Sequence, residues 1–138
     1  MKRKILCVCF GNTCRSPMLQ ALLSEKLRDK DFDVESAGLA DRFGTPASIH
    51  AVECMREKGL DITNHRSRKA SDLDLTSYDR IYCVEEVLIQ QLIALGAPND
   101  RVEVVEVSNP YDKDLETYRA CAEILSRLAA TLASKLNQ

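Results

Sequence analysis

Two patterns of apolar residues recur along this chain. Short apolar runs are typical of buried strands, and apolar residues spaced three or four positions apart are typical of helices. Short apolar runs predict four strands, at residues 5–8, 32–37, 79–84 and within 102–107. Apolar residues three and four positions apart predict four helices, at 17–27, 46–58, 85–95 and 114–136. The third helix is expected to end at Gly96, because glycine and a following proline are typical of helix ends.

Apolar faces on three of these helices identify candidate core residues. The first helix presents Met18, Leu19, Leu22, Leu23 and Leu27. The last presents Leu115, Tyr118, Ala122, Leu125, Leu132 and Leu136. The helix at 46–58 is predicted to bury Ile49, Val52 and Met55.

The order of the elements predicts the fold class. Strands that alternate with helices indicate an α/β fold, in which a parallel sheet is covered by helices on both faces. We expect a single domain over residues 1–138, since no linker, repeat or low-complexity segment divides the chain. Ligands of such folds bind at the carboxyl ends of the strands, where loops containing Cys9 and Asn109 are expected to meet.

Composition narrows the classes of partner. The formal net charge of −2 argues against general binding to nucleic acid or to an anionic membrane. No apolar run approaches membrane-spanning length and no signal peptide is recognisable, so we expect a cytoplasmic protein without membrane insertion. The six cysteines include no Cys-x-x-Cys pair and no histidine-rich partner set, so we expect no metal and no other cofactor.

One segment carries candidate chemistry: Cys9-Phe10-Gly11-Asn12-Thr13-Cys14-Arg15-Ser16-Pro17 joins the first strand to the first helix. Successive backbone N–H groups in such a loop form an anion-binding nest, and the helix dipole adds partial positive charge. This setting favours a Cys9 thiolate, a nucleophile able to accept a phosphoryl group. Arg15 is placed to direct two donors at phosphoryl oxygens. Ser16, the expected N-cap before Pro17, is placed to donate to the departing sulfur.

This segment resembles the phosphate-binding loop of the low molecular weight protein tyrosine phosphatases, and the resemblance covers nearly the whole chain. The further matches are Glu35-Ser36-Ala37-Gly38, Gly59-Leu60-Asp61-Ile62, His65-Arg66-Ser67-Arg68, Asn109-Pro110-Tyr111 and Leu115-Glu116-Thr117-Tyr118-Arg119. The resemblance implies a four-stranded sheet of order 2-1-3-4. It also implies hydrolysis of phosphotyrosine in a phosphorylated protein partner, and of small aryl phosphates, through a phosphocysteine on Cys9. We expect a monomer or weak dimer.

The resemblance implies supporting roles outside the nucleophile. Asn12, Ser16, Ser36 and His65 match positions that form a hydrogen-bond network around the loop. His50 has no such match and is expected to be an ordinary helix residue. A further match concerns charge: Arg68 corresponds to an arginine that the family pairs with an acid, and we expect Glu85 to be that acid.

Three more residues bear on substrate and regulation. Tyr111 matches an aromatic at the rim of the cleft, where it can stack on a substrate ring. Thr13 resembles the bacterial branch that removes phosphate from arginine side chains, because a smaller polar residue leaves room for a guanidinium. A reversible disulfide between Cys9 and Cys14, which the resemblance favours, would make Cys9 redox-sensitive and protect it from over-oxidation.

The sequence departs from the family at the general acid, which is an aspartate directly before a proline. Here that position is Asn109, and an amide cannot protonate a leaving phenolate as a carboxylic acid does. General acid catalysis is typically worth ~10²–10⁴-fold in rate. Asp112 and Asp114 are candidate substitute acids, and Asp112 also makes the rim more acidic. We therefore expect a retained phosphatase site with weakened or relocated acid catalysis.

Two other functional classes remain open. A thioredoxin-linked arsenate reductase would share the loop, and Cys83 is suitably placed for its thiol relay. Residues 84–97, however, contain no second cysteine to continue that relay. An inactive phosphoprotein-binding relic is the other alternative, and it is motivated by Asn109.

Overall fold

Four parallel strands form the centre of the structure, a computed structural model that describes residues 2–138. They are β1 (Arg3–Cys9), β2 (Phe32–Gly38), β3 (Arg80–Cys83) and β4 (Val102–Val104). Their order in the sheet is β2-β1-β3-β4, with every neighbouring pair parallel. This confirms the predicted fold class and the strand order implied by the family resemblance.

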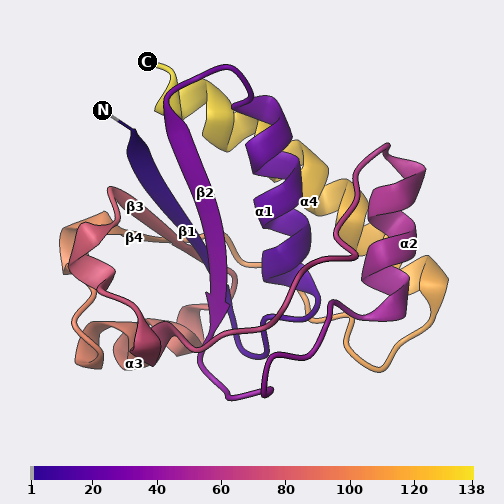
Figure 1. The fold of residues 1–138 in the computed structure, drawn as a ribbon, viewed down its shortest axis with the longest axis horizontal. Helices are drawn as coiled ribbons and strands as arrows, with labels where there is room; N and C mark the ends of the chain where they lie inside the picture. Colours follow the sequence, from indigo (N-terminus) through magenta and orange to yellow (C-terminus); the bar gives the residue numbers. More distant parts are fainter. Residues whose placement is uncertain (1) are drawn as a thin grey trace.

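Helices cover both faces of this sheet (Figure 1). One face carries α1 (Arg15–Lys26), α2 (Ile49–Glu57) and α4 (Leu115–Leu136), and the other carries α3 (Ile89–Ala94) with short 3₁₀ turns. Strand β1 faces both layers because its side chains alternate: Ile5, Cys7 and Cys9 join the first core, whereas Leu6 and Val8 join the second.

The first helix begins two residues earlier than the sequence predicted. α1 starts at Arg15 with Cys14 as its N-cap residue, so Ser16 and Pro17 lie inside the first turn. Proline is tolerated there because first-turn N–H groups have no intrahelical acceptor. The Ser16 side chain does not cap the helix and instead contacts Cys9. The predicted apolar residues of this helix are buried.

The predicted apolar face of the second helix was wrong at Ile49. α2 begins at Ile49 rather than at residue 46, because the preceding residues extend along the loop and the Ser48 N–H donates to the Thr13 carbonyl at 2.9 Å. Ile49 is 83% exposed, whereas Val52 packs partly buried against the core and Met55 is buried as predicted. Ala51 and Cys54 complete the buried face.

The remaining helices differ from prediction in smaller ways. The segment expected as one helix at 85–95 contains a 3₁₀ turn at Glu86–Leu88 followed by α3. α4 forms as predicted with Asp114 as its N-cap, and five of its six predicted apolar residues are buried, Leu115 being only half-buried. Within residues 2–138, no helix is both long enough and apolar enough to span a membrane.

Candidate active site

The segment that joins β1 to α1 curls around the Cys9 sulfur at the carboxyl edge of the sheet. Asn12 adopts the left-handed conformation, with φ of 57°, and its backbone N–H donates to Cys9 Sγ at 3.1 Å. Helix α1 begins directly behind this loop, at Arg15. The sulfur therefore lies near the positive end of a 12-residue helix.

A second donor reaches the sulfur from inside α1. Ser16 Oγ lies 2.9 Å from Cys9 Sγ, and Asn12 Nδ2 donates to the same Oγ at 2.8 Å. Because a hydroxyl has one hydrogen and its oxygen already accepts from Asn12, that hydrogen is free to point at the sulfur. Hydrogen bonds of this kind stabilise an anion more than a neutral acceptor.

Asn12 is the centre of the network that holds the loop. Its Nδ2 also donates to Ser36 Oγ at 3.0 Å, and its Oδ1 accepts from the Arg68 N–H at 3.0 Å. Ser36 Oγ in turn donates to Gln20 Oε1 at 2.6 Å. All polar atoms of the Asn12 side chain thus have partners, although that side chain is completely buried.

His65 supports the loop from the outside. Its Nε2 lies 2.7 Å from the Asn12 carbonyl oxygen, which can only accept, so Nε2 carries the hydrogen. Burial of the ring holds the pKa of His65 below its usual range; the bond to Asn12 opposes this effect and the charges of Arg68 and Arg66 reinforce it. The structure thus brings together the four residues expected in the network, Asn12, Ser16, Ser36 and His65.

The end of β2 packs closely under the same loop. Gly38 pairs with Cys9 in the sheet, and the N–H groups of Leu39 and Ala40 both donate to the Phe10 carbonyl. A Cβ on Gly38 would lie 2.8 Å from the Phe10 oxygen and 3.0 Å from the Asn12 backbone nitrogen. Only glycine permits this close approach of the two backbones.

Arg15 is nearly completely buried, with 2% of its surface exposed. Its Nη1 donates to the Val107 carbonyl at 2.7 Å, and its Nη2 pairs with Glu85 Oε1 at 2.5 Å. Its buried Nε forms no hydrogen bond with any of residues 2–138. One guanidinium N–H in the cleft wall therefore remains available for an anion.

The expected pairing of Arg68 with Glu85 was wrong. Arg68 instead pairs with Glu35 at 2.7 Å and donates from Nε to the Ser36 carbonyl at 2.9 Å. Glu35 lies on β2, the strand whose end Arg68 crosses, whereas Glu85 follows β3 and faces Arg15. Hydrogen bonds from Tyr78 and Arg68, together with the charges of Arg68 and Lys4, outweigh burial and hold the pKa of Glu35 below its usual range.

The position of the family's acid lies in the cleft but holds an amide. Asn109 lines the cleft, and its Oδ1 accepts from the Tyr111 N–H at 3.1 Å. Asp114 accepts from the Thr117 hydroxyl and backbone N–H, and these bonds hold its pKa below the usual range. Asp112 is exposed, adopts φ of 63° and is not among the residues that line the cleft.

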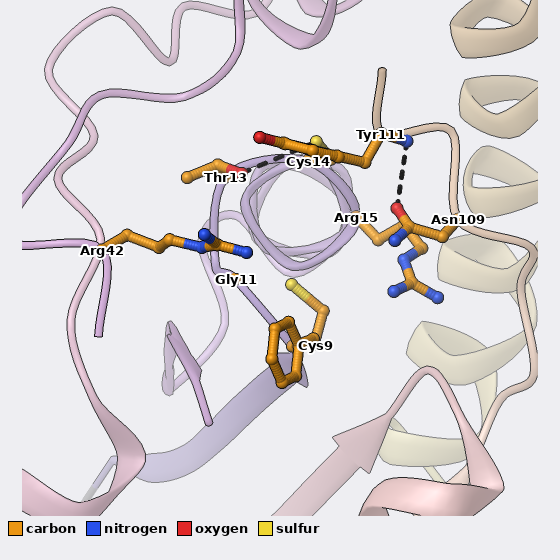
Figure 2. A pocket seen from close by; sticks show the side chains of 9 residues that line it. Cys9, Gly11, Thr13, Cys14, Arg15, Arg42, Asn109 and Tyr111 are labelled. Atoms are coloured by element: carbon orange, nitrogen blue, oxygen red, sulfur yellow. Dashed lines mark hydrogen bonds between the residues drawn. The ribbon is translucent and has the colours of Figure 1, made fainter. Parts of the chain in front are cut away.

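Aromatic and basic residues surround the opening above the sulfur (Figure 2). Arg15 and Asn109 lie on one side, and the Arg42 side chain reaches in from the opposite side. The full lining consists of Cys9, Phe10, Gly11, Thr13, Cys14, Arg15, Arg42, Asn109 and Tyr111. The cleft is therefore cationic on two sides and partly aromatic at its rim.

The other thiols are buried and free of disulfides. Cys14 Sγ lies 3.2 Å from the Tyr118 hydroxyl, and Cys83 donates to the Glu85 carbonyl at 3.1 Å. His50 packs edge-on against the Tyr118 ring, with centroids 5.2 Å apart. Over residues 2–138, no three or more histidine, cysteine, aspartate or glutamate side chains are grouped as metal ligands.

Comparison with known proteins identifies the family. The model of the low molecular weight phosphotyrosine protein phosphatases matches residues 4–138. The chain belongs to this family. The phosphatase Wzb of Escherichia coli K12, a low molecular weight protein-tyrosine-phosphatase, is 34% identical over 146 residues, covering 99% of this chain and 97% of Wzb.

Two further relatives differ in the substrate or ligand that their names state. A protein-arginine-phosphatase of Geobacillus stearothermophilus is 32% identical over 152 residues, covering 99% of this chain and 97% of the relative. The structure of Vibrio vulnificus Wzb in complex with benzylphosphonate has a TM-score of 0.88 at 29% identity, covering 98% of this chain and 99% of that one. As a member of this family, the protein is an enzyme of the hydrolase class.

Three contributors to the phosphatase site were missed from the sequence. Gln20 orients Ser36, Tyr118 contacts the loop thiol Cys14, and Arg42 enters the cleft. A glutamine on a helix and an arginine in a polar loop carry no local signal of such roles. Tyr118 was assigned only to the apolar face of α4, where its ring is indeed buried.

Proposed function

We propose that the protein hydrolyses phosphotyrosine in a phosphorylated protein, and small aryl phosphates, through a phosphocysteine on Cys9. The observation that carries this proposal is that Cys9 and Arg15 line one cleft, and the buried Nε of Arg15 has no acceptor among residues 2–138. An unpaired buried donor is costly, and a phosphoryl oxygen is the acceptor that fits it. The benzylphosphonate complex of the related Vibrio enzyme supports an aryl phosphate as the group bound.

The first step transfers the phosphoryl group to sulfur. The Cys9 thiolate attacks phosphorus, an S–P bond forms, and the P–O bond breaks with its electron pair left on the tyrosyl oxygen. Arg15 and the loop N–H groups stabilise the charge on the three remaining oxygens. The released phenolate takes up one proton.

The second step releases phosphate. Water attacks phosphorus, the S–P bond breaks, and the Ser16 hydroxyl donates a hydrogen bond to the departing sulfur. The water loses the proton that balances the one taken up by the phenolate. The products are tyrosine and inorganic phosphate, and the Cys9 thiolate is regenerated.

Solvent is the proton source that we propose for the leaving phenolate. The amide of Asn109 cannot supply it, and Asp114 is engaged at the start of α4 with a lowered pKa. A phenol has a pKa of about 10, so the unprotonated leaving group is poor and the first step is slow. Asp112 remains the substitute acid to test, although reaching the cleft would require its turn to move.

Phosphoarginine is the second candidate substrate. Thr13 lines the cleft, and the related Geobacillus enzyme is named a protein-arginine-phosphatase. Loss of the acid at position 109 is less damaging for phosphoarginine than for phosphotyrosine, because the positive charge of its guanidinium takes up the electron pair of the breaking P–N bond and a neutral guanidine leaves. The alternatives outside the phosphatases have weaker support: Cys83 is fully buried and no cysteine follows in residues 84–97.

The decisive experiment measures turnover of a phosphotyrosine peptide and an aryl phosphate by the unaltered chain and by Cys9→Ser. We expect turnover that Cys9→Ser abolishes, with acid quenching trapping phosphate on Cys9. Cys54→Ala, which alters a buried thiol on α2, is the matched control and should retain activity. Peptide binding without turnover would identify the phosphoprotein-binding relic, and arsenate-dependent thiol oxidation would identify the reductase.

A further inference from the structure

Arg42 brings a second guanidinium into the cleft, on the side opposite Arg15 (Figure 2). Its Cζ lies 5.6 Å from the centre of the Phe10 ring and 5.9 Å from that of Tyr111. Both rings are about half exposed, at 45% and 54%, so Arg42 stands between the two aromatic walls of the opening. A phosphorylated side chain that reaches Cys9 must pass these three residues.

The loop lets the Arg42 guanidinium lie directly over it. A Cβ on Gly11 would be 3.1 Å from Arg42 Nε, and the same point is 3.7 Å from Thr13 Oγ1. The guanidinium therefore shares the floor of the opening with Thr13. Any group bonded to the phosphate meets both side chains.

No carboxylate neutralises Arg42 within the part of the chain that is described. None of the ion pairs among residues 2–138 includes it. The adjacent Asp41 accepts from the Phe43 N–H at 2.8 Å and faces Lys69 Nζ at 3.8 Å. The positive charge of Arg42 is thus directed at whatever enters the cleft.

We propose that Arg42 is a specificity residue that selects phosphotyrosine over phosphoarginine, an inference that rests on the proposed phosphatase function. The ring of phosphotyrosine is neutral, and a guanidinium over an aromatic face attracts it. The carrier group of phosphoarginine is itself a guanidinium, whose positive charge would face Arg42 in a narrow cleft. The room left by Thr13 admits a guanidinium, and the charge of Arg42 rejects it.

The net charge of the substrate side chain also favours binding of phosphotyrosine over phosphoarginine. A phosphotyrosine side chain carries about −1.5 to −2 charges at pH 7. In phosphoarginine one positive charge offsets part of the phosphoryl charge. An extra cation at the rim therefore favours the more strongly anionic substrate.

The test compares two peptides of identical sequence that carry either phosphotyrosine or phosphoarginine at the same position. We expect the unaltered enzyme to have the higher kcat/KM for phosphotyrosine. Arg42→Gln should lower the ratio of the two kcat/KM values about fivefold or more, the effect of one unit-charge contact at about 4 Å in water. Arg42→Lys should keep most of the ratio because it keeps the charge.

Arg28→Gln is the matched control, because Arg28 is exposed beyond the far end of α1 and pairs only with Glu25. It should leave the ratio unchanged. An unchanged ratio in Arg42→Gln, or preference of the unaltered enzyme for phosphoarginine, would overturn the role of Arg42 and leave a phosphatase. Failure of the unaltered enzyme to hydrolyse either peptide would overturn the proposed function, and the inference with it.

Discussion

The Ser16 hydroxyl lies 2.9 Å from the Cys9 sulfur, and the Asn12 side-chain amide donates to the same hydroxyl oxygen at 2.8 Å. In the proposed mechanism the serine serves the nucleophile twice, before attack and when the sulfur leaves phosphorus. Its own position is fixed by the first turn of α1 rather than by the loop. The helix and the nucleophile are therefore coupled through one hydrogen bond.

Ser16→Ala removes that bond and should make Cys9 a weaker nucleophile. Hydrogen bonds to charged groups contribute about 1.5–3 kcal/mol, so we expect alkylation of Cys9 by iodoacetamide at pH 7 to slow about tenfold or more. The exposed Ser24 on the same helix provides the control, because Cys9 in Ser24→Ala should be alkylated at the parent rate. Equal alkylation rates in Ser16→Ala and the parent would show that the serine does not activate the thiol.

Gly38→Ala should damage the active site through a steric clash alone. Its Cβ would meet the Phe10 oxygen at 2.8 Å, so the loop must move. We expect a loss of about 1–3 kcal/mol in the free energy of unfolding, measured in urea, together with a large fall in kcat/KM. Gly59→Ala is the comparison, because that position has φ of 79° but no atom near the added Cβ. Gly59→Ala should lose stability and keep its activity per folded molecule.

His65 should make stability depend on pH between the usual histidine pKa of about 6.5 and the lower value in the folded protein. Above this window both folded and unfolded states hold a neutral ring. As the pH falls through it, the unfolded chain binds a proton that the folded chain excludes, so the free energy of unfolding decreases. His65→Gln should show a shallower decrease between pH 7 and pH 5 in urea titrations. Parallel slopes for parent and variant would contradict the role assigned to burial of the ring.

Glu85→Ala should leave the buried Arg15 guanidinium without its counter-ion. Breaking a fully buried pair costs about 3–5 kcal/mol, and we expect less here because Glu85 keeps 27% exposure. Inorganic phosphate supplies the missing negative charge, so it should raise the Tm of Glu85→Ala more than that of the parent. Glu86→Ala, at the exposed neighbouring position, should behave like the parent. An equal phosphate effect in all three proteins would argue that phosphate does not reach Arg15.

Local sequence signals predicted the elements that bring the chemistry together. The apolar run before Cys9 and the helical spacing of apolar residues in α1 and α4 each reflect a preference of a few adjacent residues. Their positions at the carboxyl edge follow from the parallel topology. The Asn12 network was expected only from resemblance, since its partners come from three separate segments.

Contacts between distant segments could not be predicted in the same way. Glu85 follows β3 and pairs with Arg15, whereas Arg68 pairs with Glu35 on β2. These pairings depend on how the strand ends are placed in the folded sheet. Ile49 is exposed at the first position of α2, directly after the backbone bond from Ser48 to Thr13. Each outcome depends on tertiary contacts that override local periodicity.

A Cys9 phosphatase that operates without an acid at position 109 should show a rate that depends strongly on the leaving group. The measurement is kcat/KM for a series of aryl phosphates whose phenols differ in pKa, for the parent and for Asn109→Asp. We predict a steep fall with rising phenol pKa in the parent and a shallow one in Asn109→Asp, with the variant faster by about 10²–10⁴-fold on phenols near pKa 10. A shallow dependence in the parent that Asn109→Asp does not change would rule out a first step that lacks a general acid. It would show that another group, with Asp112 the first to replace, already donates the proton.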